Sequence, residues 1–473
     1  MSDCVVHPLD LSIRELAGRL RDGLRAVELV EAVLGRIAER NGGEPTFDGD
    51  PDAVNAWVHL DPAAARAAAA EADRRLAAGD PSPLLGIPVG VKDLFAVAGQ
   101  PLTASSRVRR GQGATEDSAV WRALAEAGAV YIGHTHTHEF AAGGTTDQVG
   151  NPWDRARSAG GSSGGSGAAI AAGMVPLALG TDTAGSLRIP AALNGVSAFK
   201  PSFGRVPTDG VIPLAATLDH AGPLARTIDD CAIALEVLSG AARARDPFGL
   251  GARPAVPAPA AMDLRGARIA LTDRPDSMPV TEDVLDGYAR ARAVLEELGA
   301  VIVELPAPED LAKSDYDVIL LAEARSYHES LGASPEDYRP STREFLASGA
   351  APLPVDLYLA AQERRLEVTA KWQAWFEEHR VAALLEPTSA TTAPERGHGY
   401  DAGRAIGGTD PLTCFTATWN VTGFPVAAIP AGIGSRTGLP VGVSIIGPGD
   451  ADAETLAIAS ALQRRLPVPI PEW

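Results

Sequence analysis

The sequence has little cysteine and no surplus of basic charge. Its 473 residues include only three cysteines, Cys4, Cys231 and Cys414. They lie far apart and form no CxxC pair, so we expect neither a disulfide framework nor a zinc site. Asp and Glu number 60 against 41 Lys and Arg, which gives a net charge of −19. Nucleic acid and anionic membrane surfaces are therefore not expected partners, because binding them needs clustered cations.

Long apolar runs are also missing. No stretch of about 18 residues is free of Gly, Pro and charge, so we expect no membrane-spanning helix. The first residues, MSDCVVHPLDLSIREL, lack the basic and then apolar segments of a secretory leader, and we therefore expect a cytoplasmic protein. The remaining composition, 45% hydrophobic and 21% charged, is typical of a globular protein that is long enough to bury a large core.

The hydrophobic pattern changes after the first 80 residues. Residues 1–80 have helical spacing, with a capping box at Ser12 and Glu15. Beyond them, short apolar runs alternate with helical patterns, which predicts an α/β fold with a mixed, mainly parallel sheet covered by helices on both faces. The expected strands are 86–91, 129–133, 175–180, 267–272, 301–305, 382–387, 425–430 and 441–446; the expected later helices are 117–127, 229–239, 284–298, 355–378 and 453–465.

The stretch 158–188, SAGGSSGGSGAAIAAGMVPLALGTDTAGSLR, is unusually rich in Gly and Ser. A flexible linker would lead into polar sequence, whereas this stretch leads into an apolar run that must be buried. A phosphate-binding loop would end in Gly-Lys-Ser or Gly-Lys-Thr, which is absent. Residues 161–165 match GxSxG with Ser163 at the centre, but no strand pattern precedes them and no downstream histidine has a convincing context.

A lysine offers a fourth interpretation of the stretch. Lys92, in GVKDLF, follows an apolar strand pattern. Burial disfavours the charged form of a lysine, and a neutral lysine can act as a base. Hydroxyl groups lie downstream at Ser162 and Ser186. A lysine, a relay serine and a nucleophilic serine would form a triad without histidine.

These motifs resemble the amidase signature family. The resemblance rests on GGSSGGSGAAIAAGMVPLALGTDTAGSLRIPAALNGVSAFKPSFGRVP, supported by GIPVGVKD, EFAAGGTTDQVGNPWDRAR, LDHAGPLARTIDD and GLPVGVSIIGP. It is strongest over 85–235 and looser over 380–465. It implies one amidase domain over 1–473, divided into a helical N-terminal region (1–80), a signature core (81–240), a variable substrate-side region (241–380) and a return to the sheet (381–473).

The resemblance also implies roles for individual residues. Lys92 would be the base, Ser162 the relay, held after a cis Gly161–Ser162 peptide bond, and Ser186 the nucleophile. The expected oxyanion hole consists of the main-chain N–H groups of Thr183, Ala184, Gly185 and Ser186. The expected substrate-binding segment is Gly143, Gly144 and Thr145. No cofactor and no metal are implied.

The implied reaction is hydrolysis of a carboxylic amide, or a similar C–N bond, through an acyl-enzyme on serine. The implied substrate is a small-molecule amide. The resemblance is compatible with a homodimer and does not fix the oligomeric state. One alternative is the glutaminase subunit of a tRNA-dependent amidotransferase; its expected RRxxLG-type segment is missing, and RPSTREFLASGAAPLPVDLYLAAQERR stands in that region, as in stand-alone amidases. A catalytically inactive binding scaffold is the alternative from another class.

Two departures from the common family pattern lie near the expected substrate site. Ala184 stands where many members have glycine, and GHTHTHEF replaces the frequent GKTNMDEF. The histidines His134, His136 and His138 alternate along a strand pattern, which would suit a metal, but no further cluster of ligands completes a site. We expect them to line the pocket or to form supporting hydrogen bonds.

Overall fold

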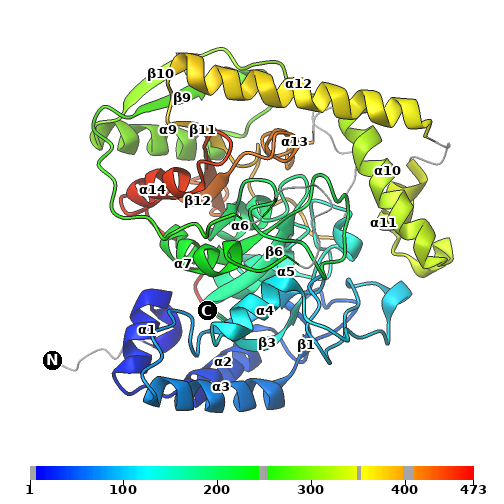
Figure 1. The fold of residues 1–473 in the computed structure, drawn as a ribbon, viewed down its shortest axis with the longest axis vertical. Helices are drawn as coiled ribbons and strands as arrows, with labels where there is room; N and C mark the ends of the chain where they lie inside the picture. Colours follow the sequence, from blue (N-terminus) through cyan, green and yellow to red (C-terminus); the bar gives the residue numbers. More distant parts are fainter. Residues whose placement is uncertain (1–6, 244–250, 252, 349–352, 398–409) are drawn as a thin grey trace.

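A single large sheet runs through the protein, shown in Figure 1, in the computed structural model that describes residues 7–243, 251, 253–348, 353–397 and 410–473. Its eleven strands within the described residues, in spatial order, are β1 (Trp57–Leu60), β3 (Val130–Thr135), β2 (Pro88–Lys92), β6 (Leu177–Asp182), β8 (His220–Ala225), β7 (Ser197–Lys200), β12 (Val426–Ile433), β13 (Pro440–Ile446), β11 (Ala383–Pro387), β9 (Arg268–Thr272) and β10 (Val301–Leu305). A separate ribbon pairs β4 (Gly150–Asn151) with β5 (Asp154–Ser158).

The strands run parallel in two blocks. One block is β3–β2–β6 and the other is β11–β9–β10. The strands between them, β8, β7, β12 and β13, join by antiparallel ladders, which the alternation of strands and helices did not predict. The predicted mixed sheet is thus confirmed. In the first block, neighbouring carboxyl ends meet at one edge, which is where α/β proteins commonly place their chemistry.

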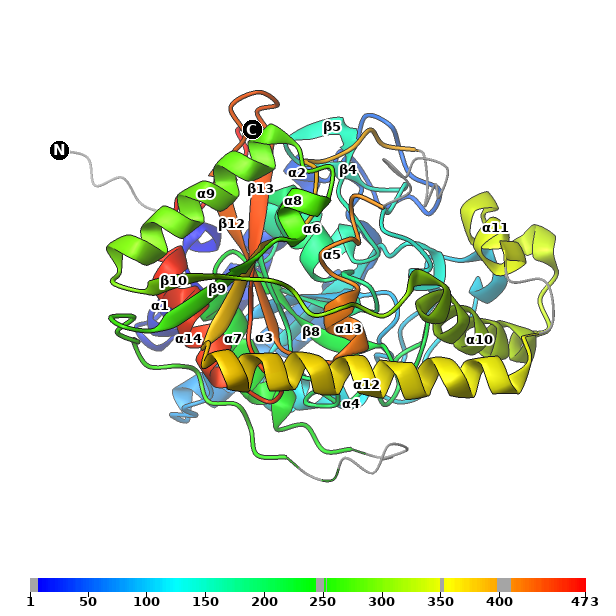
Figure 2. The same ribbon diagram turned by 90° about the horizontal axis from the view of Figure 1, so that it is seen from above.

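Helices cover both faces of this sheet, as predicted (Figure 2). On one face lie α5 (Gly164–Ala171) and α6 (Arg188–Asn194); on the other lie α7 (Ile228–Ser239) and α14 (Asp452–Gln463). The remaining helices are α1 (Ile13–Arg21), α2 (Ala26–Arg40), α3 (Pro62–Ala77), α4 (Ala119–Glu126), α8 (Arg274–Ser277), α9 (Glu282–Glu297), α10 (Lys313–Leu331), α11 (Pro340–Ser348), α12 (Val355–His379) and α13 (Thr418–Val421).

Local signals explain where several helices begin. Ser12 and Glu15 form the predicted capping box at the start of α1. Asp61 accepts a hydrogen bond from the N–H of Ala64 while Pro62 occupies the first turn of α3, where its missing N–H costs nothing. Helices α1, α2 and α3 lie together at one end of the sheet (Figure 1). Strand β1 also lies within residues 1–80, and the helical pattern did not predict it.

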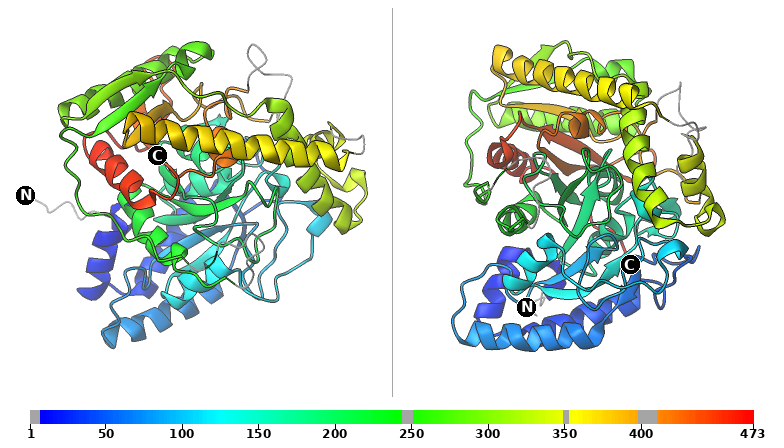
Figure 3. Two further views of the ribbon diagram at one scale, coloured as in Figure 1. Left: turned by 45° about the horizontal axis from the view of Figure 1, so that its top comes forward. Right: turned by 45° about the vertical axis from the view of Figure 1, so that its right-hand side comes forward.

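Helices α10, α11 and α12 form an arm at the edge of the molecule, which Figure 3 shows from two further sides. Of this arm the sequence predicted only α12. The helix α10 packs against α12, and Tyr316 of α10 donates a hydrogen bond to the carbonyl oxygen of Thr183, directly after β6. No helix in the described part of the chain is long and apolar enough to cross a membrane. Cys231 and Cys414 are free thiols, and Cys4 lies outside the described residues.

Candidate active site

Lys92 is the last residue of β2, and its side chain is fully buried. Its Nζ atom lies 2.7 Å from Oγ of Ser162, 2.9 Å from Oγ of Ser163 and 2.7 Å from Oγ1 of Thr181. The three hydroxyl groups come from two neighbouring elements, the N-terminal end of α5 and the strand β6. Within the described part of the chain, every hydrogen bond of this amine is therefore to a hydroxyl oxygen, and none is to a carboxylate.

The environment of Lys92 favours its neutral form. Burial lowers the pKa of Lys92 well below its ordinary value, and the charges of Asp182 and Asp219 oppose that shift only in part. A lysine whose pKa falls in this way can accept a proton near neutral pH. Lys92 is thus buried, bonded to hydroxyl oxygens and shifted towards its neutral form.

The expected relay, Ser162, belongs to this lysine network, and the expected nucleophile, Ser186, lies on a turn that is hydrogen-bonded to the next residue, Ser163. The Gly161–Ser162 peptide bond is cis, as predicted. The main-chain N–H of Ser163 donates to the carbonyl oxygen of Ser186 at 3.2 Å, which ties the relay segment to the turn between β6 and α6. Among the hydrogen bonds of the described residues, none joins the hydroxyl groups of Ser162 and Ser186. The structure therefore shows a contact between Lys92 and Ser162 and a main-chain hydrogen bond between Ser163 and Ser186, while proton transfer between Ser162 and Ser186 stays a prediction.

A buried ion pair organises the turn that carries Ser186. Asp182 ends β6, and its carboxylate accepts hydrogen bonds from the main-chain N–H groups of Gly185 at 2.8 Å and Leu187 at 3.1 Å. The guanidinium of Arg188 donates to both oxygens of the same carboxylate, at 2.9 and 2.8 Å, and to the side-chain oxygen of Asn420 at 2.6 Å. Both partners are inaccessible to solvent. Arg188 therefore orients the turn.

The donors predicted for the oxyanion hole are not equivalent. Because the N–H of Gly185 already donates to Asp182, the remaining candidates are the N–H groups of Thr183, Ala184 and Ser186. Gly185 has φ of +131°, and a Cβ atom there would lie 2.4 Å from Oγ1 of Thr416, so the position needs glycine. Ala184 is not in the left-handed region, so its methyl group is tolerated, and it is the partly exposed residue of the turn.

The predicted substrate-binding segment lies against the relay. A Cβ atom at Gly161 would fall 2.4 Å from the carbonyl oxygen of Thr145, so the two backbones are in close contact. A Cβ atom at Gly143 would collide with the ring of His138. Gly144 lies near Leu412. The structure thus places Thr145 directly against the Gly161–Ser162 peptide, while Gly143 packs against His138 and Gly144 lies near Leu412. Their role in binding substrate stays a prediction.

The three histidines of GHTHTHEF act as buried hydrogen-bonding groups. The ring of His134 contacts the hydroxyl of Tyr131 at 2.8 Å and the carbonyl oxygen of Phe95 at 3.0 Å. The ring of His136 lies 3.1 Å from Oγ of Ser105 and 3.0 Å from the carbonyl oxygen of Thr46. Burial lowers the pKa of His136 to about 4 and, with Arg339 and Lys92 adding to the effect, that of His138 to about 3. All three are neutral at neutral pH.

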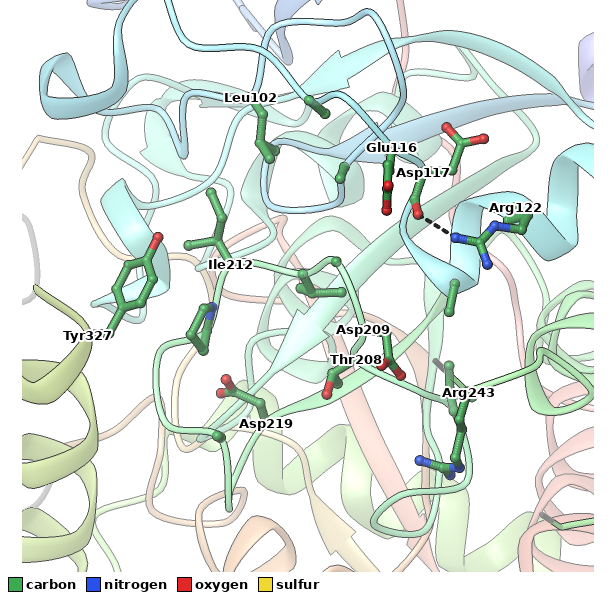
Figure 4. Close-up of a pocket in the computed structure, with 18 of the residues that line it drawn as sticks. Leu102, Glu116, Asp117, Arg122, Thr208, Asp209, Ile212, Asp219, Arg243 and Tyr327 are labelled. Atoms are coloured by element: carbon green, nitrogen blue, oxygen red, sulfur yellow. Dashed lines mark hydrogen bonds between the residues drawn. The ribbon is translucent and has the colours of Figure 1, made fainter. Parts of the chain in front are cut away.

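Two cavities share residues of the loop 208–219 in their lining, and the inner one also touches the turn that leads to Ser186. The inner one, about 160 Å³, touches Thr181 and Thr183; the outer one, about 710 Å³, opens past Tyr327 (Figure 4). Asp219 lines both. Thr181 and Asp219 were not predicted as site residues, although they lie in the motifs GTDT and LDHAGP.

Comparisons with known proteins agree on one family. A family model described as Amidase matches residues 47–456. The glutamyl-tRNA(Gln) amidotransferase A-subunit of Ralstonia nicotianae is 36% identical over 93% of this chain and 94% of that protein. A solved bacterial aryl acylamidase of the amidase signature enzymes has a TM-score of 0.84 and 30% identity, covering 96% of each chain. A chain from a vestigial complex that reveals the evolutionary origins of an s-triazine catabolic enzyme has a TM-score of 0.86 and 31% identity, covering 97% of this chain and 100% of that one.

Proposed function

Because the chain belongs to the amidase family and is an amide-hydrolysing enzyme, we propose that it acts through an acyl-enzyme on Ser186, activated by Ser162 and Lys92. The observation that carries this proposal is the position of Nζ of Lys92 within 2.9 Å of three hydroxyl oxygens. An inactive scaffold would not require a buried, neutral lysine with three hydroxyl partners. Burying an amine costs free energy, and a catalytic role explains why the chain keeps it.

The hydrogen atoms in this network can be counted. Ser163 donates its hydroxyl proton to the carbonyl oxygen of Thr181 at 3.2 Å, so towards Lys92 it can only accept. A neutral amine has two N–H bonds and one lone pair. If it donates to Ser163 and Thr181, its lone pair remains for the hydroxyl proton of Ser162. Ser162 is then free to accept a proton from Ser186, and a protonated Lys92 would keep all three contacts.

The reaction follows from this arrangement. Oγ of Ser186 attacks the amide carbonyl carbon, its proton passes to Ser162, and the proton of Ser162 passes to Lys92. The C–N bond breaks as the same path returns a proton to the leaving nitrogen, which departs as ammonia or an amine. Water then gives a proton to the relay, attacks the ester carbon and releases the acid and the free hydroxyl of Ser186. The N–H groups of Thr183, Ala184 and Ser186 are the donors that we assign to the oxyanion; one such donor is typically worth about 3 kcal/mol of transition-state stabilisation.

We propose a stand-alone amidase as the main function and the glutaminase component of an amidotransferase as the second candidate. The structural similarity to an aryl acylamidase at a TM-score of 0.84 supports the first. The identity of 36% to an amidotransferase A-subunit supports the second, in which the substrate would be glutamine and the chain would work in a complex with other proteins. A cytoplasmic location and a homodimer remain predictions.

Two measurements test these proposals. A fluorophosphonate probe should label the wild-type protein on one serine, and Ser186→Ala should abolish the labelling, whereas Ser202→Ala, a buried serine elsewhere, should not. Labelling that persists in Ser186→Ala would overturn the assignment of the nucleophile. Release of ammonia from glutamine, with no hydrolysis of simple or aryl amides by the isolated chain, would favour the amidotransferase component over the stand-alone enzyme.

A further inference from the structure

Asp219 directly precedes β8 and lies half-buried beside the nucleophile turn. Its carboxylate accepts a hydrogen bond from the hydroxyl group of Thr183 at 2.5 Å and bonds from the main-chain N–H groups of Leu214 and Ala215 at 2.9 and 3.2 Å. Thr183 is the first residue of the turn that leads to Ser186. The carboxylate therefore connects that turn to the loop 208–219.

The cavities explain why this connection matters. The inner cavity, about 160 Å³, is lined by Thr183 and Asp219 on the side of the turn that faces the loop. Side chains do not fill this space, so packing alone does not fix the turn there. The hydrogen bond between Thr183 and Asp219 joins the turn to the loop beside this unfilled space.

Helices α10 and α12 of the arm form hydrogen bonds with the same loop, 208–219. Glu323 of α10 accepts hydrogen bonds from the N–H and the hydroxyl group of Thr217, at 2.9 and 2.6 Å. Arg365 of α12 donates to the carbonyl oxygen of Thr217 at 2.7 Å. The hydroxyl group of Tyr316, also on α10, donates to the carbonyl oxygen of Thr183 at 3.4 Å. Two helices of the arm thus hold the segment that carries Asp219.

From this geometry we infer that Asp219 is a positioning residue for the amide hydrolysis, acting through Thr183 to hold the main-chain donors of the turn in place. Asp219 takes no part in proton transfer, because its two oxygens already accept from Thr183 and from the loop. The inference rests on the proposed function, since it concerns the donors assigned there to the oxyanion. In physical terms, the donors lower the barrier only while they stay aligned with the developing negative charge.

A variant pair at position 183 tests the inference. Thr183→Val keeps the shape of the side chain and removes the hydroxyl group, whereas Thr183→Ser keeps the hydroxyl group. We expect Thr183→Val to lower kcat about tenfold with a much smaller change in KM, and Thr183→Ser to stay close to wild type. The rate of phosphonate labelling at Ser186 should fall in parallel, because the adduct is a tetrahedral mimic of the same oxyanion.

Asp219→Asn, alone and combined with Thr183→Val, gives a double-mutant cycle for this hydrogen bond. Asn cannot accept from Thr183 and from both N–H groups of the loop, so we expect it to lower kcat by a similar factor, and the double variant with Thr183→Val should be no slower than the slower single variant. Additive losses, or a Thr183→Val enzyme with wild-type kcat, would overturn the inference. If Asp219→Asn does not fold, the Thr183 pair alone decides. Wild-type protein that is not labelled on Ser186 would instead contradict the proposed function.

Discussion

Among the described residues, Lys92 and Lys200 are both fully buried, and they end strands in the same central part of the sheet. Burial lowers the pKa of each well below its ordinary value. Their partners differ. Nζ of Lys92 contacts three side-chain hydroxyl oxygens, whereas Nζ of Lys200 donates to one main-chain carbonyl oxygen, that of Pro201, at 3.1 Å.

The charges around the two lysines differ as well. The charges that act on Lys92 are the carboxylates of Asp182 and Asp219, which favour its protonation. At Lys200 the guanidinium of Arg188 adds to the effect of burial, and Asp182 and Asp452 oppose it. A low pKa is therefore common to both, while only Lys92 has a hydroxyl group through which a proton can leave. A buried lysine becomes a candidate base through its hydrogen-bond partners, and burial alone does not distinguish it.

The largest expected effect is a difference in kcat/KM between variants of the two lysines. Lys92→Met should lower kcat/KM by about 10⁴-fold, since the relay loses its proton acceptor. Lys200→Met should change kcat/KM by less than about tenfold, because no proton path leads from Lys200 to Ser186. Steady-state kinetics at neutral pH on an amide that the enzyme hydrolyses measures both. Equal losses in the two folded variants would remove the distinction drawn here.

The second effect concerns Asp182, the carboxylate whose charge acts on both lysines. Asp182→Asn leaves the guanidinium of Arg188 buried without its counter-charge, which typically costs about 3–5 kcal/mol of unfolding free energy. Urea denaturation followed by circular dichroism measures the loss. Glu31→Gln, which breaks the exposed pair between Arg66 and Glu31, is the control and should leave the midpoint unchanged. A stable Asp182→Asn protein would contradict the organising role given to this ion pair.

The third effect tests the hydroxyl network around Lys92. Thr181→Val removes one hydroxyl acceptor, and acceptors stabilise the charged ammonium more than the neutral amine. The pKa of Lys92 should therefore fall further, and the acid limb of the profile of kcat/KM against pH should move to lower pH, with a loss of about tenfold at the optimum. Thr272→Val, at a buried threonine on the distant strand β9, is a matched control that should leave the profile unchanged. An acid limb that moves to higher pH would contradict the assignment.

The sequence predicted the parts of the fold that have strong, continuous patterns. The run at 301–305 coincides with β10, and the pattern at 355–378 misses the end of α12 by one residue. The strands β7 and β8 were missed, because Ser197–Lys200 is short and His220–Ala225 contains glycine and proline, which favour turns. The helix α10 was also missed: its polar and apolar residues do not separate into two faces, since it packs between the loop 208–219, α11 and α12.

The candidate site likewise has residues that the sequence predicted and residues that it did not. Lys92 and Ser162 could be found because they lie in long, specific motifs, and the structure brings them within 2.7 Å. The contribution of Thr181 could not be found, because a threonine on a buried strand is common and its value here depends on the pairing of β2 with β6. The loss of Gly185 as a free donor depends on a carboxylate three residues away, which only the folded turn brings into contact.

The smallest expected effect concerns the stability of the second lysine. Lys200 must lose its charge, or keep it at a cost, when the chain folds, because burial lowers the pKa of its amine. Lys200→Met has a similar volume and no amine, so it should be more stable than wild type by about 1 kcal/mol near neutral pH. A pKa that is lower in the folded state makes wild-type stability rise with pH up to about 10.4, the pKa in the unfolded chain, so the advantage of the variant should shrink over that range. Thermal unfolding at several pH values measures the difference. A variant that is less stable at every pH would show that Lys200 makes a favourable interaction beyond its one bond to Pro201, and the contrast with Lys92 would then lie in function alone.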